Sequence, residues 1–129
     1  MIAVDTSALM AILLGEPEAD ACIAVLEAET DVLISAAVMA ESLIVAGRRN
    51  VADEMVMLID GLGLNISTVT PAVARRAAKA YEEWGKGVHP AGLNFGDCFS
   101  YEVAKEHQCS LLYVGNDFLK TDVESVLRK

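Results

Sequence analysis

Short apolar segments alternate along this chain with longer stretches that carry helix signals, and this alternation constrains the fold more than any other feature. The segments expected to form strands are 2–5, 31–35, 65–69 and 111–114. Helices are expected over 7–14, 17–29, a stretch beginning at 36, 51–61, 71–84 and 94–107. Such alternation favours βα units and a mostly parallel sheet. The sequence therefore predicts a single α/β domain over 1–129, with the tail 122–127 either an edge strand or a short helix.

Several predicted helix ends are marked by residues that favour them. Pro17 and Pro71 stand where a first helical turn favours proline. Ser35 and Asn94 can cap the helices that follow them. The segment 85–93, rich in glycine, is expected to be the one substantial loop.

Composition agrees with a single core built from aliphatic side chains. The chain has 129 residues, 53% of them hydrophobic but only 5% aromatic, and this suits helices packed on a parallel sheet. Its three cysteines lack CxxC or CxH spacing, which argues against a disulfide framework and a zinc site. The N-terminus lacks the pattern of a signal peptide, and no apolar run approaches the roughly 18–20 residues that span a bilayer. We expect a cytoplasmic protein without a membrane segment.

The net charge of −9 argues against a broad electrostatic grip on nucleic acid, because phosphate affinity normally comes from Lys and Arg. A bound cation would cancel part of this excess locally. The basic residues are partly clustered, as Arg48-Arg49 and Arg75-Arg76-Lys79. These clusters are either solvated helix faces or part of a substrate surface, and the sequence leaves both interpretations open.

Four acidic residues fall where strands or helices of the predicted sheet begin or end. Asp5 closes the first apolar run, Asp117 follows the last, and Glu41 and Asp97 lie inside or at the start of helices. Functional groups gather beyond the carboxyl ends of strands in open parallel sheets. Converging carboxylates need a cation, and oxygen-only ligands favour Mg²⁺ or Mn²⁺ over zinc. The pattern predicts a divalent-metal phosphodiesterase.

Each acid also has a possible structural role. Asp5 could cap the helix that follows it, Asp97 could favour the positive end of its helix, and Asp117 could belong to a turn. Glu41 is harder to explain in this way, because its helix is apolar on nearly all sides and should bury it. A lone buried carboxylate is costly unless it is paired or bound to a metal.

Other chemistries find little support. Ser7 and Ser35 lack a nucleophile elbow, and neither a phosphate-binding loop nor a dinucleotide fingerprint occurs. His89 falls in the predicted loop, and His107 at a helix end suits a favourable charge there. Cys98 is expected to pack in the core.

Four segments occur together in a characteristic order: Ile2-Ala-Val-Asp-Thr-Ser-Ala-Leu9, Ser35-Ala-Ala-Val-Met-Ala-Glu41, Leu93-Asn-Phe-Gly-Asp-Cys-Phe-Ser-Tyr101 and Leu111-Leu-Tyr-Val-Gly-Asn-Asp-Phe118. With them the chain resembles the PIN-domain ribonucleases, most closely the VapC toxins of bacterial toxin–antitoxin modules. The resemblance implies a three-layer α/β/α fold with a mostly parallel sheet of four or five strands. It also implies an endoribonuclease dependent on Mg²⁺ or Mn²⁺, an RNA substrate, a VapB-like antitoxin and a homodimer.

The resemblance also assigns the site. Asp5, Glu41, Asp97 and Asp117 are expected to be both the catalytic residues and the metal ligands.

Four further residues are expected to support these acids. Thr6 and Ser7 match the small hydroxyl residue that the family places near its first acid. Many relatives have Thr or Ser two residues before the fourth acid, where this chain has Gly115, so Asn116 or Asp122 is expected to substitute.

A competing hypothesis needs no turnover. A non-catalytic α/β module could use its acidic pocket to hold a cation or the arginines of a partner, since receiver-like domains also gather acids at strand ends. The apolar stretches 9–14 and 55–62 could serve partner contacts or pack in the core.

Overall fold

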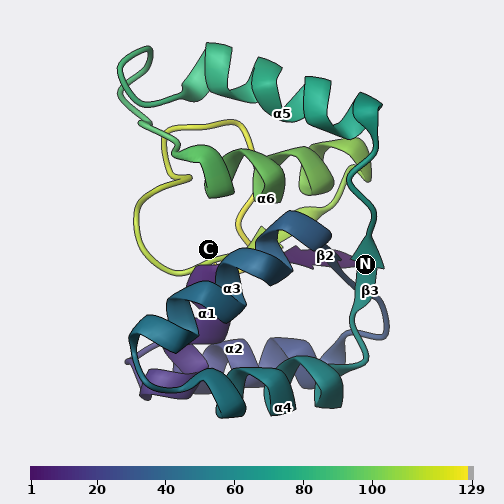
Figure 1. The fold of residues 1–129 in the computed structure, drawn as a ribbon, viewed down its shortest axis with the longest axis vertical. Helices are drawn as coiled ribbons and strands as arrows, with labels where there is room; N and C mark the ends of the chain where they lie inside the picture. The colour runs from purple at the N-terminus through teal and green to yellow at the C-terminus, as the bar shows by residue number, and fades with distance from the viewer. Residues whose placement is uncertain (128–129) are drawn as a thin grey trace.

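The computed structural model describes residues 1–127. Its strands are β1 (Ile2–Val4), β2 (Val32–Ser35), β3 (Asn65–Ser67) and β4 (Ser110–Leu112). Its helices are α1 (Thr6–Leu14), α2 (Ala19–Ala28), α3 (Ala36–Arg48), α4 (Ala52–Leu62), α5 (Pro71–Trp84) and α6 (Phe95–Glu106) (Figure 1). All strand pairs are parallel, in the order β3-β2-β1-β4. The predicted α/β fold with a parallel sheet of four strands is confirmed.

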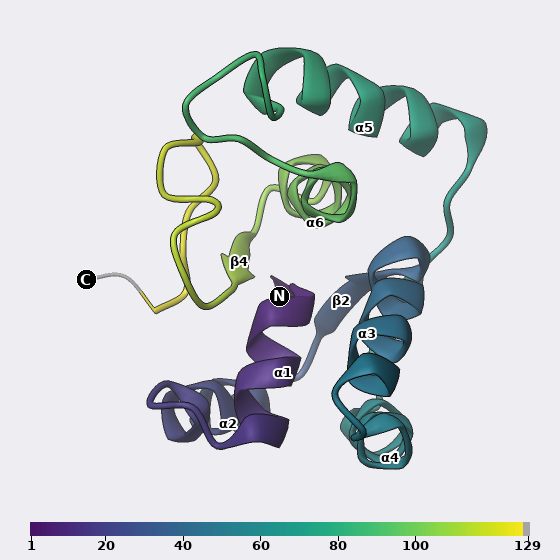
Figure 2. The same cartoon turned by 60° about the vertical axis from the view of Figure 1, so that its left-hand side comes forward.

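The helices cover both faces of this sheet. Helices α5 and α6 lie on one side, and α1, α2, α3 and α4 lie on the other (Figure 2). Helix α6 contacts β1, β2 and β4 directly, and α5 packs on α6. The three-layer arrangement therefore puts α6 between the sheet and α5.

The core is aliphatic, as the composition predicts. Strands β1 and β2 are buried along their whole length, which suits continuous apolar runs inside a parallel sheet. Leu9 of α1 and Met55 of α4 are fully buried, so core packing accounts for much of the two apolar stretches singled out above. No helix within residues 1–127 is long and apolar enough to cross a membrane.

Most helix starts follow their predicted signals. The Ser35 hydroxyl accepts a hydrogen bond from the Ala37 amide at 3.2 Å and caps α3. Pro71 begins α5, and Asn94 caps α6. The prediction for Pro17 is wrong by two residues, because α2 begins at Ala19 and Pro17 lies in the turn before it.

The tail 122–127 follows the edge of the sheet without forming a regular element. Leu111 N–H donates to the Glu124 carbonyl at 2.8 Å, and Val126 N–H donates to the Leu111 carbonyl at 3.1 Å. Ser125 forms an isolated parallel bridge with Leu111. Of the two predicted alternatives, the structure favours an edge segment beside β4 over a helix.

Candidate active site

Asp5 directly follows β1, an inner strand, and therefore lies at the carboxyl end of the sheet. Its N–H donates to the Leu112 carbonyl at 3.0 Å, so Asp5 sits beside the end of β4. Its carboxylate caps α1, because Oδ2 accepts from Ser7 N–H at 3.0 Å. The capping role is confirmed, and it holds the carboxylate at the positive end of a helix.

Two serine hydroxyls also hold the Asp5 carboxylate. Ser7 Oγ donates to Asp5 Oδ2 at 2.7 Å, and Ser100 Oγ of α6 donates to Asp5 Oδ1. The Ser7 oxygen in turn accepts from Val114 N–H at 3.0 Å. Ser7 therefore joins Asp5 to the segment that leads from β4 to Asp117.

Glu41 lies on α3 and is held by the residue that follows Asp5. Thr6 Oγ1 donates to Glu41 Oε1 at 2.7 Å and lies 2.9 Å from Ser42 Oγ. Glu41 is mostly but not fully buried, as its apolar helix leads us to expect. Its helix leaves Ile44 58% exposed along a groove facing α6, and Glu41 lines the same groove.

The first turn of α6 closes on Glu41 from the other side. A Cβ built on Gly96 would overlap Glu41 Oε2 and would lie 2.6 Å from Cδ. Burial raises the pKa of Glu41, the Thr6 hydrogen bond opposes this, and the charges of Asp5 and Asp117 raise it further. The glycine thus allows a close approach that brings α3 and α6 together at the acids.

Asp97 is the most deeply buried of the four acids apart from Asp5. It forms a capping box, in which Asn94 N–H donates to Asp97 Oδ2 at 3.0 Å and Asp97 N–H donates to Asn94 Oδ1 at 2.9 Å. Burial raises the pKa of Asp97 to about 7 against the opposing Asn94 hydrogen bond, and the charges of Asp5, Asp117 and Glu41 add to the rise. The charges of the four acids therefore interact at the carboxyl end of the sheet.

Asp117 is exposed on the loop after β4, and its neighbour anchors it. Phe118 is 1% exposed, and its ring centroid lies 5.0 Å from that of Tyr113. Because Phe118 is fixed in the core, the backbone of Asp117 is held close to the ends of the strands.

Comparison with known proteins identifies the family. The sequence of residues 2–124 matches the family model of the PIN domain. The chain belongs to the PIN-domain family. It is similar to ribonuclease VapC30 of Mycobacterium tuberculosis, with 39% identity over 126 residues that cover 95% of this chain and 96% of the relative.

Solved structures share the fold of this PIN domain. VapC20 of Mycobacterium tuberculosis, described as a sarcin-ricin loop cleaving toxin, matches with a TM-score of 0.76, 18% identity, and coverage of 95% of this chain and 96% of that one. A toxin–antitoxin complex from Klebsiella pneumoniae matches with a TM-score of 0.70, 20% identity, and coverage of 95% and 93%.

Two residues expected to support the acids of this PIN domain have other contacts. Asp122 accepts from Tyr101 Oη at 2.6 Å and from Lys105 Nζ at 3.2 Å, so its carboxylate anchors the tail to α6. Asn116 is exposed, and its backbone carbonyl accepts from Leu119 N–H at 3.2 Å. The hydroxyls that do reach the acids are those of Thr6, Ser7 and Ser100.

Sequence reasoning missed Ser100 and Gly96. Ser100 lies three residues after Asp97, a spacing that puts two side chains on one face of a helix. That spacing could have identified Ser100. Gly96 carried no comparable signal, because its importance depends on Glu41 from a distant segment.

The donor set of this PIN domain fits a hard divalent cation. Four carboxylates and three hydroxyls supply oxygen only. Burial first, and then the charges of the neighbouring acids, raise the pKa values of Glu41 and Asp97, and a cation would offset both effects. Within residues 1–127, no group of three Asp, Glu, His or Cys side chains is close enough together to hold a metal ion without moving. Ion binding would therefore require these side chains to move closer together.

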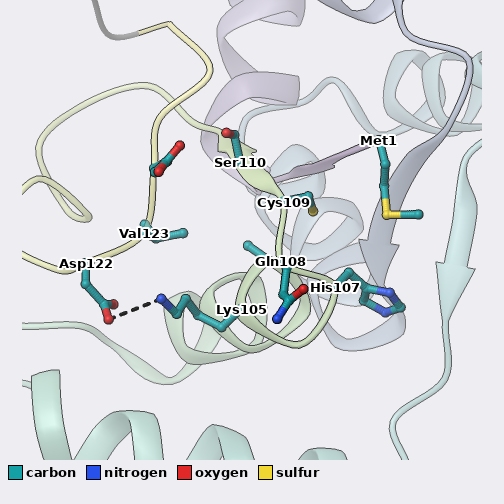
Figure 3. A pocket seen from close by; sticks show the side chains of 10 residues that line it. Met1, Lys105, His107, Gln108, Cys109, Ser110, Asp122 and Val123 are labelled. Carbon is teal, nitrogen blue, oxygen red and sulfur yellow. Dashed lines mark hydrogen bonds and ion pairs between the residues drawn. The ribbon is translucent and has the colours of Figure 1, made fainter.

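A separate pocket of about 680 Å³ lies at the opposite end of the sheet (Figure 3). It is lined by Met1, which precedes β1, by Ser110, which begins β4, and by Lys105 and His107. Figure 3 shows the ion pair between Lys105 and Asp122 at its rim. None of the four acids lines this pocket, so it is separate from the candidate active site.

Proposed function

We propose that this PIN domain is an endoribonuclease of the VapC kind, the toxin of a type II toxin–antitoxin module, acting in the cytoplasm with Mg²⁺ or Mn²⁺. The observation that carries the proposal is that hydrogen bonds join the acid-bearing segments at the carboxyl end of the sheet, since Thr6 bonds Glu41 and Ser100 of α6 bonds Asp5. The charges of Asp5 and Asp117 accordingly raise the pKa values of Glu41 and Asp97. The relatives named VapC ribonucleases, which match almost the whole chain, support the same activity.

In this proposal the four carboxylates would hold the cation. A bound divalent ion lowers the pKa of water and stabilises negative charge on a phosphate. The chain's own part is to hold its carboxylates in place: Ser7 and Ser100 fix Asp5, and Thr6 fixes Glu41. The Asn94 N–H fixes Asp97 in the same way. These neutral donors orient the acids without supplying a counter-charge, which leaves their negative charge for the cation.

The basic residues divide between structural and substrate roles. Arg76 pairs with Glu102 at 2.9 Å and with Glu106 at 3.4 Å, so it is engaged between α5 and α6. Arg48 lines the groove that also contains Glu41. We therefore expect Arg48, and not Arg76, to contact the phosphates of an RNA substrate next to the acids.

The same groove suits the antitoxin. It is a cavity of about 660 Å³ between α3 and α6, and it joins apolar side chains to the acidic site. Phe95 is 76% exposed and Ile44 is 58% exposed along it. An apolar partner segment with a basic residue that pairs with Glu41 would cover this surface and block access to the acids.

The test uses the purified protein without its partner. With Mn²⁺ and total RNA it should cleave, a chelator should stop cleavage, and Asp5→Asn should be inactive while keeping the wild-type circular dichroism spectrum. Addition of the antitoxin should suppress cleavage, and light scattering should give the mass of a dimer. Persistent inertness with intact binding of a cation would favour the non-catalytic module instead.

A further inference from the structure

The Asp5 carboxylate accepts three hydrogen bonds, and they are unevenly distributed. Oδ2 accepts from the Ser7 amide at 3.0 Å and from the Ser7 hydroxyl at 2.7 Å, while Oδ1 accepts from Ser100 alone. An ionised carboxylate offers about four lone-pair sites on its two oxygens. Oδ2 is therefore saturated, and Oδ1 keeps a single site.

The two serines approach Asp5 from opposite sides of the sheet. Ser7 belongs to α1, which follows β1 directly, and Ser100 belongs to α6 on the other face. Ser100 is 2% exposed, so water cannot readily replace its hydroxyl. Ser7 restrains the Asp5 carboxylate through Oδ2, and Oδ1 is held as well only when α6 is docked on the sheet.

A buried serine in a helix does not need such a partner. Ser42 of α3, also fully buried, donates to the carbonyl of Val38 four residues earlier at 2.8 Å, which is the usual local solution. Ser100 instead donates to a residue 95 positions away in the sequence. This contrast indicates that the Ser100 hydroxyl serves Asp5 and not its own helix.

We infer that Ser100 is a positioning residue that selects which oxygen of Asp5, and which lone pair of that oxygen, faces the divalent cation. The inference rests on the proposed function. Without Ser100, Oδ1 gains a second free site and only the two Ser7 bonds to Oδ2 hold the carboxylate, so its rotation about the Cβ–Cγ bond is less restricted. Cation binding then has to restore an orientation that the wild-type protein already holds.

The experiment measures Mn²⁺ binding by titration calorimetry and, separately, RNA cleavage as a function of Mn²⁺ concentration. Ser100→Ala should weaken Mn²⁺ binding about tenfold, the usual scale for an outer hydrogen bond to a metal ligand. The Mn²⁺ concentration for half-maximal cleavage should rise by the same factor, and the rate at saturating Mn²⁺ should return close to the wild-type rate. A purely structural defect would lower the active fraction without moving that midpoint.

Matched variants separate positioning from stability. Ser35→Ala removes another buried hydroxyl, whose contact is with the Ala37 amide, and it should leave the Mn²⁺ midpoint unchanged. Ser100→Thr keeps the hydroxyl and should bind Mn²⁺ as tightly as the wild-type protein. Ser100→Cys keeps the size but has a weak donor, so it should weaken binding even if Ser100→Ala does not fold.

The outcomes distinguish this inference from the proposed function. The proposed function stands if the wild-type protein binds Mn²⁺ and Asp5→Asn does not. The positioning role of Ser100 is overturned if the Mn²⁺ affinity of Ser100→Ala or Ser100→Cys stays within twofold of the wild-type value. A wild-type protein that neither binds Mn²⁺ nor cleaves RNA would overturn both.

Discussion

Helix α6 carries two buried acids whose surroundings are opposite. Glu102, which is 4% exposed, faces α5 and pairs with Arg76 at 2.9 Å. Asp97, which is 6% exposed, faces the end of the sheet and three further acids, and its pKa rises to about 7. Burial alone therefore does not mark a functional acid. The difference lies in whether the protein supplies the counter-charge or leaves it to a ligand.

The largest expected effect comes from neutralising Asp97, the buried acid of α6 that has no basic partner within residues 1–127. Asp97→Asn should lower cleavage more than about 100-fold, beyond the loss typical of an outer contact. An Asn oxygen can still accept from Asn94 N–H, so the capping box and the fold should survive. Specific activity and circular dichroism measure the two effects. Asp53→Asn, at an exposed position in the first turn of α4, is the control and should remain active.

A second prediction concerns the contact between α6 and Glu41. Gly96→Ala should displace the Glu41 carboxylate, because the new Cβ would overlap it, and cleavage should fall about 10- to 100-fold. Gly61→Ala is the matched control, since it lies in α4 with nothing within 4 Å of its Cβ. An alanine in a helix normally gains about 0.5–1 kcal/mol over glycine, so Gly61→Ala should be more stable and fully active. Equal activity of both variants would show that Glu41 is not needed in its present position.

Much of the fold was predictable because local signals and the apolar pattern agree. Ser35 and Asn94 cap the helices as predicted, and the buried strands follow the continuous apolar runs. Pro17 misled because proline is tolerated in a turn before a helix as well as inside its first turn.

The candidate site was predictable only in part. Asp5, Asp97 and Asp117 stand at or next to element ends, which a sequence can show, whereas Glu41 lies within α3. The spacing of three residues puts Ser100 on the helix face of Asp97, but its partner Asp5 follows from the packing of α6 on β1, which no local pattern encodes. The contacts of Asp122 were not predictable for the same reason, because the tail runs beside β4 and brings its carboxylate to Tyr101.

The stability of the protein without metal should depend on pH through Asp97. The folded-state pKa of about 7 lies above the ordinary value of 3.8 for an aspartate, so the folded protein binds more protons than the unfolded chain between these values. This contribution to stability is complete below about pH 4 and is lost as the pH rises through about 7. Urea unfolding with chelator at pH 5.5 and at about pH 8 should therefore show a fall of at most a few kcal/mol. Asp97→Asn should reduce that fall, and an unchanged pH dependence in this variant would contradict the assignment.

The smallest expected effect on cleavage comes from breaking the ion pair between Arg76 of α5 and Glu102 of α6. Arg76→Ala leaves the buried Glu102 carboxylate without its cation, so the protein should melt at a lower temperature, while the specific activity of the folded fraction stays at the wild-type value. The double variant Arg76→Ala with Glu102→Gln should recover part of the lost stability, because the uncompensated charge is gone. Thermal melts and cleavage rates at saturating Mn²⁺ measure the two quantities. A loss of cleavage in folded Arg76→Ala would place a catalytic or substrate role on the α5 side of the helix, and the division between a structural and a functional face of α6 would then fail.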